Sequence, residues 1–199
     1  MNHPPRSHPL RLGVLGSGKG SNFHAIAHAI AAGTLAAEVR IVISDVETAG
    51  ILSLARERGL RAEFVAPGRF KTKLEPEAEE RVVTLLKDAD VELVVLAGYM
   101  RMIKPPLLDA FPRRIINIHP SLLPAFPGLE AWKQALAAGA TETGCTVHFV
   151  DGGMDTGEVI AQSAVAIFPS DTPEELHARI QVAEHELYPA VIARFASGK

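Results

Sequence analysis

The stretch from Arg11 to Ala32, RLGVLGSGKGSNFHAIAHAIAA, decides how the chain begins to fold. Its apolar start at residues 11–15 predicts a strand, and its alanine-rich end at residues 23–32 predicts a helix that stops at Gly33. A glycine-rich loop, GSGKGSN at residues 16–22, joins the two. A strand, a glycine loop and a helix in this order predict the start of a βαβ unit, with an anion site where the helix begins.

The loop resembles two phosphate-binding patterns and matches neither. From Gly13, GVLGSGKG follows the nucleotide pattern G-x-x-x-x-G-K-[ST], except that Gly20 stands where a hydroxyl must reach magnesium. Read as the dinucleotide pattern G-x-G-x-x-G, the loop supplies Gly16 and Gly18 but has Ser21 in place of the third glycine. The loop therefore predicts an anion site and leaves the identity of the phosphate open.

Predicted strands and helices alternate beyond this first unit. In chain order they are Val39–Ser44 (strand), Ala49–Arg58 (helix), Ala62–Val65 (strand), Glu75–Lys87 (helix), Leu93–Leu96 (strand), Ile115–Ile118 (strand) and Trp132–Ala138 (helix). This order indicates an α/β fold with a mostly parallel sheet and helices on both faces, similar to a Rossmann domain. In such folds the ligand lies beyond the carboxyl ends of the strands.

The last third of the chain has a different pattern. Two strand-like runs, Gly144–Val150 and Val159–Ile167, are joined by DGGMDTGE with no helix between them, which predicts an antiparallel pair. Thr172, followed by PEE, predicts the capped start of a final helix. Pro189 is expected to bend or interrupt this helix, and residues 191–195 could resume it.

Size and composition exclude several classes of protein. With 199 residues, 47% of them hydrophobic, the chain is expected to form one domain over residues 11–199 after a loose, proline-rich tail at residues 1–10. A net charge of -3 gives no electrostatic support for nucleic-acid binding. The absence of any apolar run of ~20 residues argues against a membrane protein. A single cysteine, Cys145, fits a reducing compartment, so a cytoplasmic location is expected.

The segment NIHPSLLP at residues 117–124 carries the strongest chemical signal. Side chains alternate along a strand, so Asn117 and His119 point the same way at the end of the predicted strand. An amide donor beside an imidazole suits stabilisation of an oxyanion combined with proton movement. The alternative is a hydrogen-bonded histidine that simply closes the strand.

A carboxylate partner for the imidazole should come from a neighbouring loop. The loop DGGMDTGE offers Asp151, Asp155 and Glu158, and composition does not choose among them. His148 on the preceding strand could also face the site, and His119, His148 and Asp155 could be considered as metal ligands. Because no compact ligand signature such as H-E-x-x-H is present, we expect no metal.

Taken together, these segments resemble one known family. SGKGSN, LAGYMRMI at residues 96–103, NIHPSLLPAFPG at 117–128, VHFVDGGMDTG and EHELYP at 184–189 are similar, in this order, to phosphoribosylglycinamide formyltransferase, the folate-dependent glycinamide ribonucleotide transformylase of purine synthesis. The resemblance runs from about Arg11 to about Phe195 and implies the formyltransferase variant of the α/β fold. Methionyl-tRNA formyltransferase carries a further carboxyl-terminal domain, and formyltetrahydrofolate deformylase an amino-terminal one, so neither is the expected match.

The resemblance also implies roles for particular residues. The catalytic group would be Asn117, His119 and Asp155. The substrate would be held by Gly20, Ser21 and Asn22 at its phosphate, by Lys73 where the family often has an arginine, and by Glu184 near its glycinamide end. The folate would be bound by Met100, Arg101, Met102, Ile103, Val150 and Asp151.

The implied reaction moves the formyl group of 10-formyltetrahydrofolate, a cosubstrate, to the amine of glycinamide ribonucleotide, without metal or nicotinamide. Asp155 would keep His119 protonated. No nucleic-acid or membrane partner is implied, and the expected state is a monomer or a weak homodimer. Three alternatives remain: a formyltetrahydrofolate hydrolase, a nicotinamide oxidoreductase that uses Asp45 for the ribose, and a catalytically silent phosphate-binding module.

Overall fold

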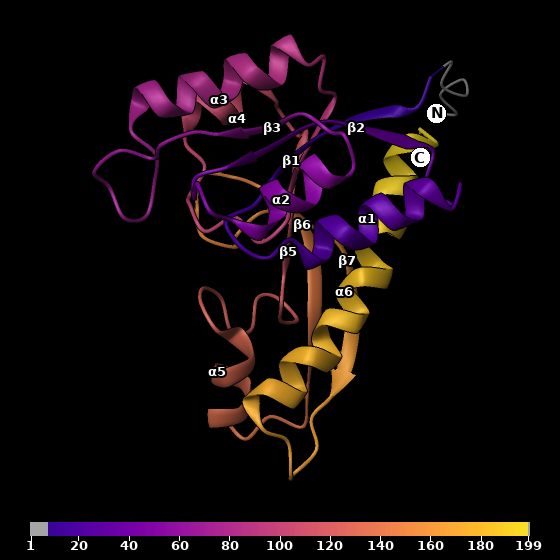
Figure 1. Cartoon of the computed structure of the whole chain (residues 1–199). Helices are drawn as coiled ribbons and strands as arrows, with labels where there is room; N and C mark the ends of the chain where they lie inside the picture. Colours follow the sequence, from indigo (N-terminus) through magenta and orange to yellow (C-terminus); the bar gives the residue numbers. More distant parts are fainter. Residues whose placement is uncertain (1–7, 199) are drawn as a thin grey trace.

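A central sheet organises residues 8–198, the part of the chain described by the computed structural model (Figure 1). Its strands are β1 (Leu10–Leu15), β2 (Ala37–Ser44), β3 (Ala62–Phe64), β4 (Leu93–Leu96), β5 (Ile115–His119), β6 (Glu142–Phe149) and β7 (Val159–Ala166). They lie in the order β3-β2-β1-β4-β5-β6-β7. The first five strands are parallel, and β6 runs antiparallel to both of its neighbours, β5 and β7. The predicted α/β fold with an antiparallel element near its end is confirmed.

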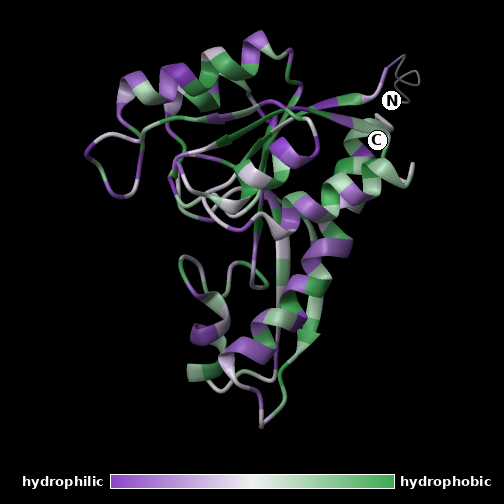
Figure 2. Ribbon diagram, in the orientation of Figure 1, coloured by the Kyte–Doolittle hydropathy of each residue, from purple (hydrophilic) through white to green (hydrophobic). Residues whose placement is uncertain are grey.

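Helices cover both faces of this sheet. They are α1 (Ser21–Ala31), α2 (Gly50–Glu57), α3 (Pro76–Asp88), α4 (Pro105–Ala110), α5 (Ala131–Ala137) and α6 (Pro173–Ala196). Side chains of α1, α2 and α6 pack in one core, and those of α3 and α4 pack in the other. In β4, Leu93 and Val95 face the first core, while Val94 and Leu96 face the second. This two-sided burial explains the unbroken apolar runs of the central strands, which are green in Figure 2.

The order of the strands places the ligand site. The chain moves from β1 outward to β2 and β3, then returns to the other side of β1 to form β4 and β5. The loops that follow β1 and β4 therefore leave the sheet in opposite directions and open a crevice at its carboxyl edge. The glycine loop at residues 16–22 and the segment at residues 97–103 lie at this edge.

Three features of the fold differ from the sequence expectations. The short helix α4 was not predicted, because a six-residue run that opens with Pro105 and Pro106 is too brief to show helical periodicity. The expected interruption at Pro189 is wrong, since α6 continues through this residue to Ala196. The expected tail at residues 1–10 lies mostly outside the described residues, and Leu10 is already part of β1.

Helix α6 continues because its second half is anchored in the core. Tyr188 is fully buried, and its hydroxyl lies 2.9 Å from the carbonyl oxygen of Leu96 and 3.0 Å from that of Ile116. Val191 and Ile192, beyond the proline, are also fully buried. Burial of these side chains offsets the loss of one helical hydrogen bond at Pro189. The tyrosine thereby ties α6 to β4 and β5 where the site residues begin.

We expect Tyr188→Phe to lower the free energy of unfolding by about 1–3 kcal/mol, because two buried carbonyls lose their shared donor. Urea denaturation monitored by circular dichroism measures this loss. Tyr99→Phe is the matched control, since the Tyr99 hydroxyl has no hydrogen-bond partner among the described residues. Equal losses in the two variants would contradict the role given to Tyr188.

Candidate active site

A cavity of about 710 Å³ lies at the carboxyl edge of the sheet. Its walls come from the glycine loop and the start of α1, the segment after β4, the end of β5, the loop before α5, the loop between β6 and β7, and one side of α6. The expected site residues that line it are Gly20, Ser21, Asn22, Met100, Arg101, Met102, Ile103, Asn117, His119, Val150, Asp151, Asp155 and Glu184. Residues more than 160 positions apart in the sequence thus meet in one space.

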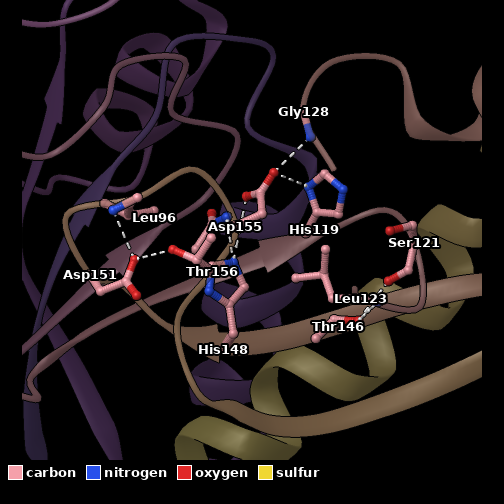
Figure 3. A network of polar contacts seen from close by, with 12 residues as sticks. Leu96, His119, Ser121, Leu123, Gly128, Thr146, His148, Asp151, Asp155 and Thr156 are labelled. Atoms are coloured by element: carbon pink, nitrogen blue, oxygen red, sulfur yellow. Dashed lines mark hydrogen bonds and ion pairs between the residues drawn. The ribbon is translucent and has the colours of Figure 1, made fainter. Parts of the chain in front are cut away.

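His119 lies at the end of β5 with both ring nitrogens engaged. Its Nε2 is 2.9 Å from the carbonyl oxygen of Phe126, which can only accept a hydrogen bond, so Nε2 carries a proton. Its Nδ1 is 3.3 Å from Asp155 Oδ2, as Figure 3 shows. A ring with a carbonyl on one side and a carboxylate on the other is placed to donate from both nitrogens, which is the imidazolium form. The alternative of a histidine that only closes the strand does not account for the carboxylate.

Asp155 is the carboxylate of the acidic loop that reaches the imidazole. Its Oδ2 also accepts a hydrogen bond of 2.8 Å from the backbone N–H of Gly128, in the segment after β5. Its backbone has φ of 55°, a left-handed conformation that is costly for a residue with a side chain. Asp151 instead binds within its own loop, accepting hydrogen bonds from Gly153 and Thr156. Of the carboxylates left open by the sequence, Asp155 is therefore the one that contacts His119.

His148 orients the amide of Asn117. The two residues lie directly opposite each other in the antiparallel pairing of β5 and β6. His148 Nδ1 is 2.8 Å from the carbonyl oxygen of Phe149 and so carries the proton, which leaves Nε2 to accept a hydrogen bond from Asn117 Nδ2 at 3.2 Å. Burial lowers the pKa of His148, in agreement with a neutral ring. The second Nδ2 hydrogen of Asn117 then remains available to a ligand.

The glycine loop leaves the start of α1 free for an anion. Gly20 precedes the helix with φ of 84°, which strongly favours glycine, and a Cβ there would lie 3.0 Å from Ile51. No side chain caps the helix, so its first backbone N–H groups have no capping partner. These N–H groups and the helix dipole favour a phosphate at residues 20–22.

Glu184 and Asn22 form a buried polar pair in the cavity wall. Asn22 Nδ2 donates to Glu184 Oε2 at 2.9 Å, and Asn22 Oδ1 has no hydrogen-bond partner among the described residues. Burial raises the pKa of the Glu184 carboxyl to about 7. Glu184 stands in an otherwise apolar stripe of α6 with a spacing of four residues, formed by Leu176, Ile180, Tyr188, Ile192 and Ala196. This position in a buried stripe is a sequence signal that could have singled out Glu184.

One expected ligand contact is placed differently. Lys73 does not line this cavity. It lies in a second cavity of about 700 Å³, with its ammonium 4.5 Å from the centre of the Phe70 ring. Lys73 and residues 20–22 therefore line different cavities. Arg101 lines the cavity at the carboxyl edge of the sheet as expected, and its guanidinium forms an ion pair of 2.7 Å with Asp45.

Residues 8–198 were expected to bind no metal ion and to cross no membrane. This part of the chain has no group of three or more histidine, cysteine, aspartate or glutamate side chains arranged to hold a metal ion. Its helices are also too short or too polar to cross a membrane.

Comparison with known families decides the classification. The sequence model of the family described as formyl transferase matches residues 10–192. The chain belongs to this family. The formyl transferase phosphoribosylglycinamide formyltransferase of Bacillus subtilis (strain 168) is 42% identical over 182 residues, which cover 92% of each chain. The enzyme of the same name from Escherichia coli (strain K12) is 39% identical over 193 residues, 96% of this chain and 89% of that one.

A larger relative and a solved structure are also similar to nearly all of this chain. The trifunctional purine biosynthetic protein adenosine-3 of Drosophila pseudoobscura pseudoobscura is 46% identical over 192 residues, and the match covers 94% of this chain but only 14% of that protein. The crystal structure of glycinamide ribonucleotide transformylase 1 from Symbiobacterium toebii superposes with a TM-score of 0.92 at 46% identity, covering 97% of this formyl transferase and 90% of that chain.

The buried carboxyl of Glu184 predicts a pH-dependent stability. This group ionises near pH 4.5 in the unfolded chain and near 7 in the folded one, so the folded state loses stability as the pH rises through this window, by about 3 kcal/mol in total. We expect the unfolding free energy of Glu184→Gln, relative to the unmodified chain, to increase over the same window. Urea denaturation at about pH 4 and about pH 8 measures the unfolding free energy of the variant and of the unmodified chain. A constant difference between them would contradict the assignment.

Proposed function

We propose that this chain transfers the formyl group of 10-formyltetrahydrofolate to the amine of glycinamide ribonucleotide, a step of purine biosynthesis. The observation that carries the proposal is the contact between His119 and Asp155 in the cavity that also contains Asn117 and the anion site of α1. Membership of the formyl transferase family and the full-length similarity to the Bacillus subtilis enzyme support the same reaction.

The reaction proceeds without an enzyme nucleophile. Burial raises the pKa of the Cys145 thiol to about 12, so that it is not a thiolate near neutral pH. The Ser121 hydroxyl is fully buried and donates to the carbonyl oxygen of Ala125 at 2.5 Å. Neither group is therefore available to attack. The substrate amine attacks the formyl carbon directly, and the formyl oxygen becomes the oxyanion of a tetrahedral intermediate.

Asn117 and His119 stabilise this oxyanion. Asn117 supplies the Nδ2 hydrogen that His148 does not take, and His119, whose two N–H groups face Phe126 and Asp155, supplies the positive charge of its imidazolium. Asp155 balances the positive charge of the ring and fixes its orientation through the contact at Nδ1. The proton lost by the amine passes, with the help of Asp155 and water, to the leaving nitrogen of the folate.

The two substrates occupy different ends of the cavity. The phosphate binds the backbone at Gly20, Ser21 and Asn22, and the glycinamide end lies near Glu184 on α6. The folate lies against the segment Met100–Ile103 and against Val150 and Asp151. The volume of about 710 Å³ falls within the usual range for small-molecule sites, roughly 300–1,000 Å³.

The alternatives are separated by geometry and by one assay. A nicotinamide enzyme would need Asp45 free for a ribose, but this carboxylate is bound to Ser17 and Arg101. A formyltetrahydrofolate hydrolase would release tetrahydrofolate without glycinamide ribonucleotide, whereas a silent binding module would release none. We expect release of tetrahydrofolate from 10-formyltetrahydrofolate only when glycinamide ribonucleotide is present. Equal release with and without this acceptor would favour the hydrolase.

We expect His119→Ala and Asn117→Ala each to lower kcat by about 100- to 1,000-fold, because Asn117 supplies a hydrogen-bond donor and His119 a positive charge that stabilise the oxyanion. The acceptor-dependent assay measures the rates, and thermal unfolding verifies that the variants are folded. His28→Ala, which changes an exposed histidine of α1 outside the cavity, is the control and should retain full activity. Near-normal turnover in a folded His119 or Asn117 variant would reject the proposed mechanism.

A further inference from the structure

Three polar side chains join the loops on the two sides of the crevice. Ser17, in the glycine loop, donates from its hydroxyl to Asp45 Oδ1 at 2.5 Å, just after β2. The other oxygen of Asp45 accepts from Arg101 Nε at 2.7 Å, in the segment after β4. The Ser17 hydroxyl also accepts a hydrogen bond of 2.9 Å from the backbone N–H of Met100. We call these side chains the Ser17–Asp45–Arg101 network.

The network continues into a fourth segment. Arg101 Nη1 lies 2.6 Å from the carbonyl oxygens of both Phe70 and Lys71, so the guanidinium bridges the carboxylate and the stretch before α3. The Asp45 side chain is 3% exposed and that of Arg101 is 15% exposed. A charge-assisted bond shielded from water in this way fixes direction as well as distance.

Two of the three members of this network lie outside the cavity, and Arg101 lines it. Residues 18–22 and 96–103 line the cavity, whereas Ser17 and Asp45 do not. The middle of the second segment has little apolar burial of its own, since Met100 is 59% exposed. Backbone hydrogen bonds fix its two ends, from Ser17 N–H to the Gly98 carbonyl at 3.0 Å and from Met102 N–H to the Thr72 carbonyl at 2.8 Å, and Ile103 is buried. Between these ends, the Ser17 hydroxyl, which accepts from Met100 N–H, and the pairing of Arg101 with Asp45 hold the segment against the glycine loop.

We propose that Ser17 and Asp45 are positioning residues for the formyl donor, holding the segment Met100–Ile103 at a fixed distance from the loop that binds the phosphate. The inference rests on the proposed function. Its physical basis is that a ligand contacted by backbone groups requires those groups to be held in place before it binds. Loosening of this segment therefore weakens binding of the formyl donor more than it disturbs the positions of His119 and Asn117.

Asp45→Asn tests this role, because the amide keeps the shape of the side chain and removes its charge. We expect KM for 10-formyltetrahydrofolate to rise by about tenfold while kcat changes by less than about threefold. Ser17→Ala, which removes only the bridging hydroxyl, should shift KM in the same direction. If the two residues act as a unit, the double variant should resemble Asp45→Asn and not the product of the two effects. The smaller Ser17 change also keeps the test available if Asp45→Asn does not fold.

The chain offers a matched control in Asp171, whose side chain is 5% exposed and pairs with Arg179 at 2.7 Å. Neither of these residues lines the cavity. Asp171→Asn removes a comparable ion pair and should lower Tm while leaving the donor KM within about twofold of the unmodified chain. A tenfold rise of KM in this control, or an unchanged donor KM in Asp45→Asn and Ser17→Ala, would overturn the inference.

The unmodified chain separates this inference from the proposed function. If it releases no tetrahydrofolate with both substrates present, the proposed function fails, and the inference fails with it. If it is active and the Asp45 and Ser17 variants keep their donor KM, only the positioning role is wrong.

Discussion

The contact between His119 and Asp155 is the interaction on which the site depends. It joins the end of a parallel strand to a loop that follows an antiparallel one, so it exists only because β6 reverses direction beside β5. The same carboxylate accepts the backbone N–H of Gly128 and thereby holds the segment after β5 over the cavity. This largely shielded carboxylate thus holds the imidazole ring, its own loop and the cavity wall at Gly128 in place, because shielding from water strengthens polar contacts.

Much of the fold could be predicted from the sequence, because strands that are buried on both faces of a sheet consist of uninterrupted apolar residues. The runs at residues 93–96 and 115–118 are apolar without interruption, and the structure places them in the middle of the sheet. The length of α6 could not be predicted in the same way. Local backbone chemistry at Pro189 argues for a break, while the contacts that oppose it come from Tyr188 and from strands more than 70 positions earlier. Local rules do not contain such long-range contacts.

The residues of the candidate site also differ in whether local sequence or long-range packing determines their place. Asn117 and His119 could be identified from residue type and strand periodicity, because both belong to one short segment. Only the family resemblance predicts Asp155 and not Asp151 as the partner of His119, because the contact depends on how the loop between β6 and β7 folds back. The surroundings of Lys73 and Arg101 could not be predicted from sequence at all: which anion or ring a long cationic side chain reaches is decided by loops that pack against each other in three dimensions.

Helix α6 has a consequence for how the chain can vary. His177, Gln181 and Glu184 line the cavity, and Tyr188, one turn further on, binds the sheet. The continuous helix therefore fixes both the distance and the relative orientation between the residues that line the cavity and the tyrosine that binds the sheet. Exchanges on its solvent side leave this spacing unchanged, but a single added or deleted residue between Gln181 and Tyr188 rotates one half against the other by about 100°. The helix should thus tolerate changes of identity far better than changes of length.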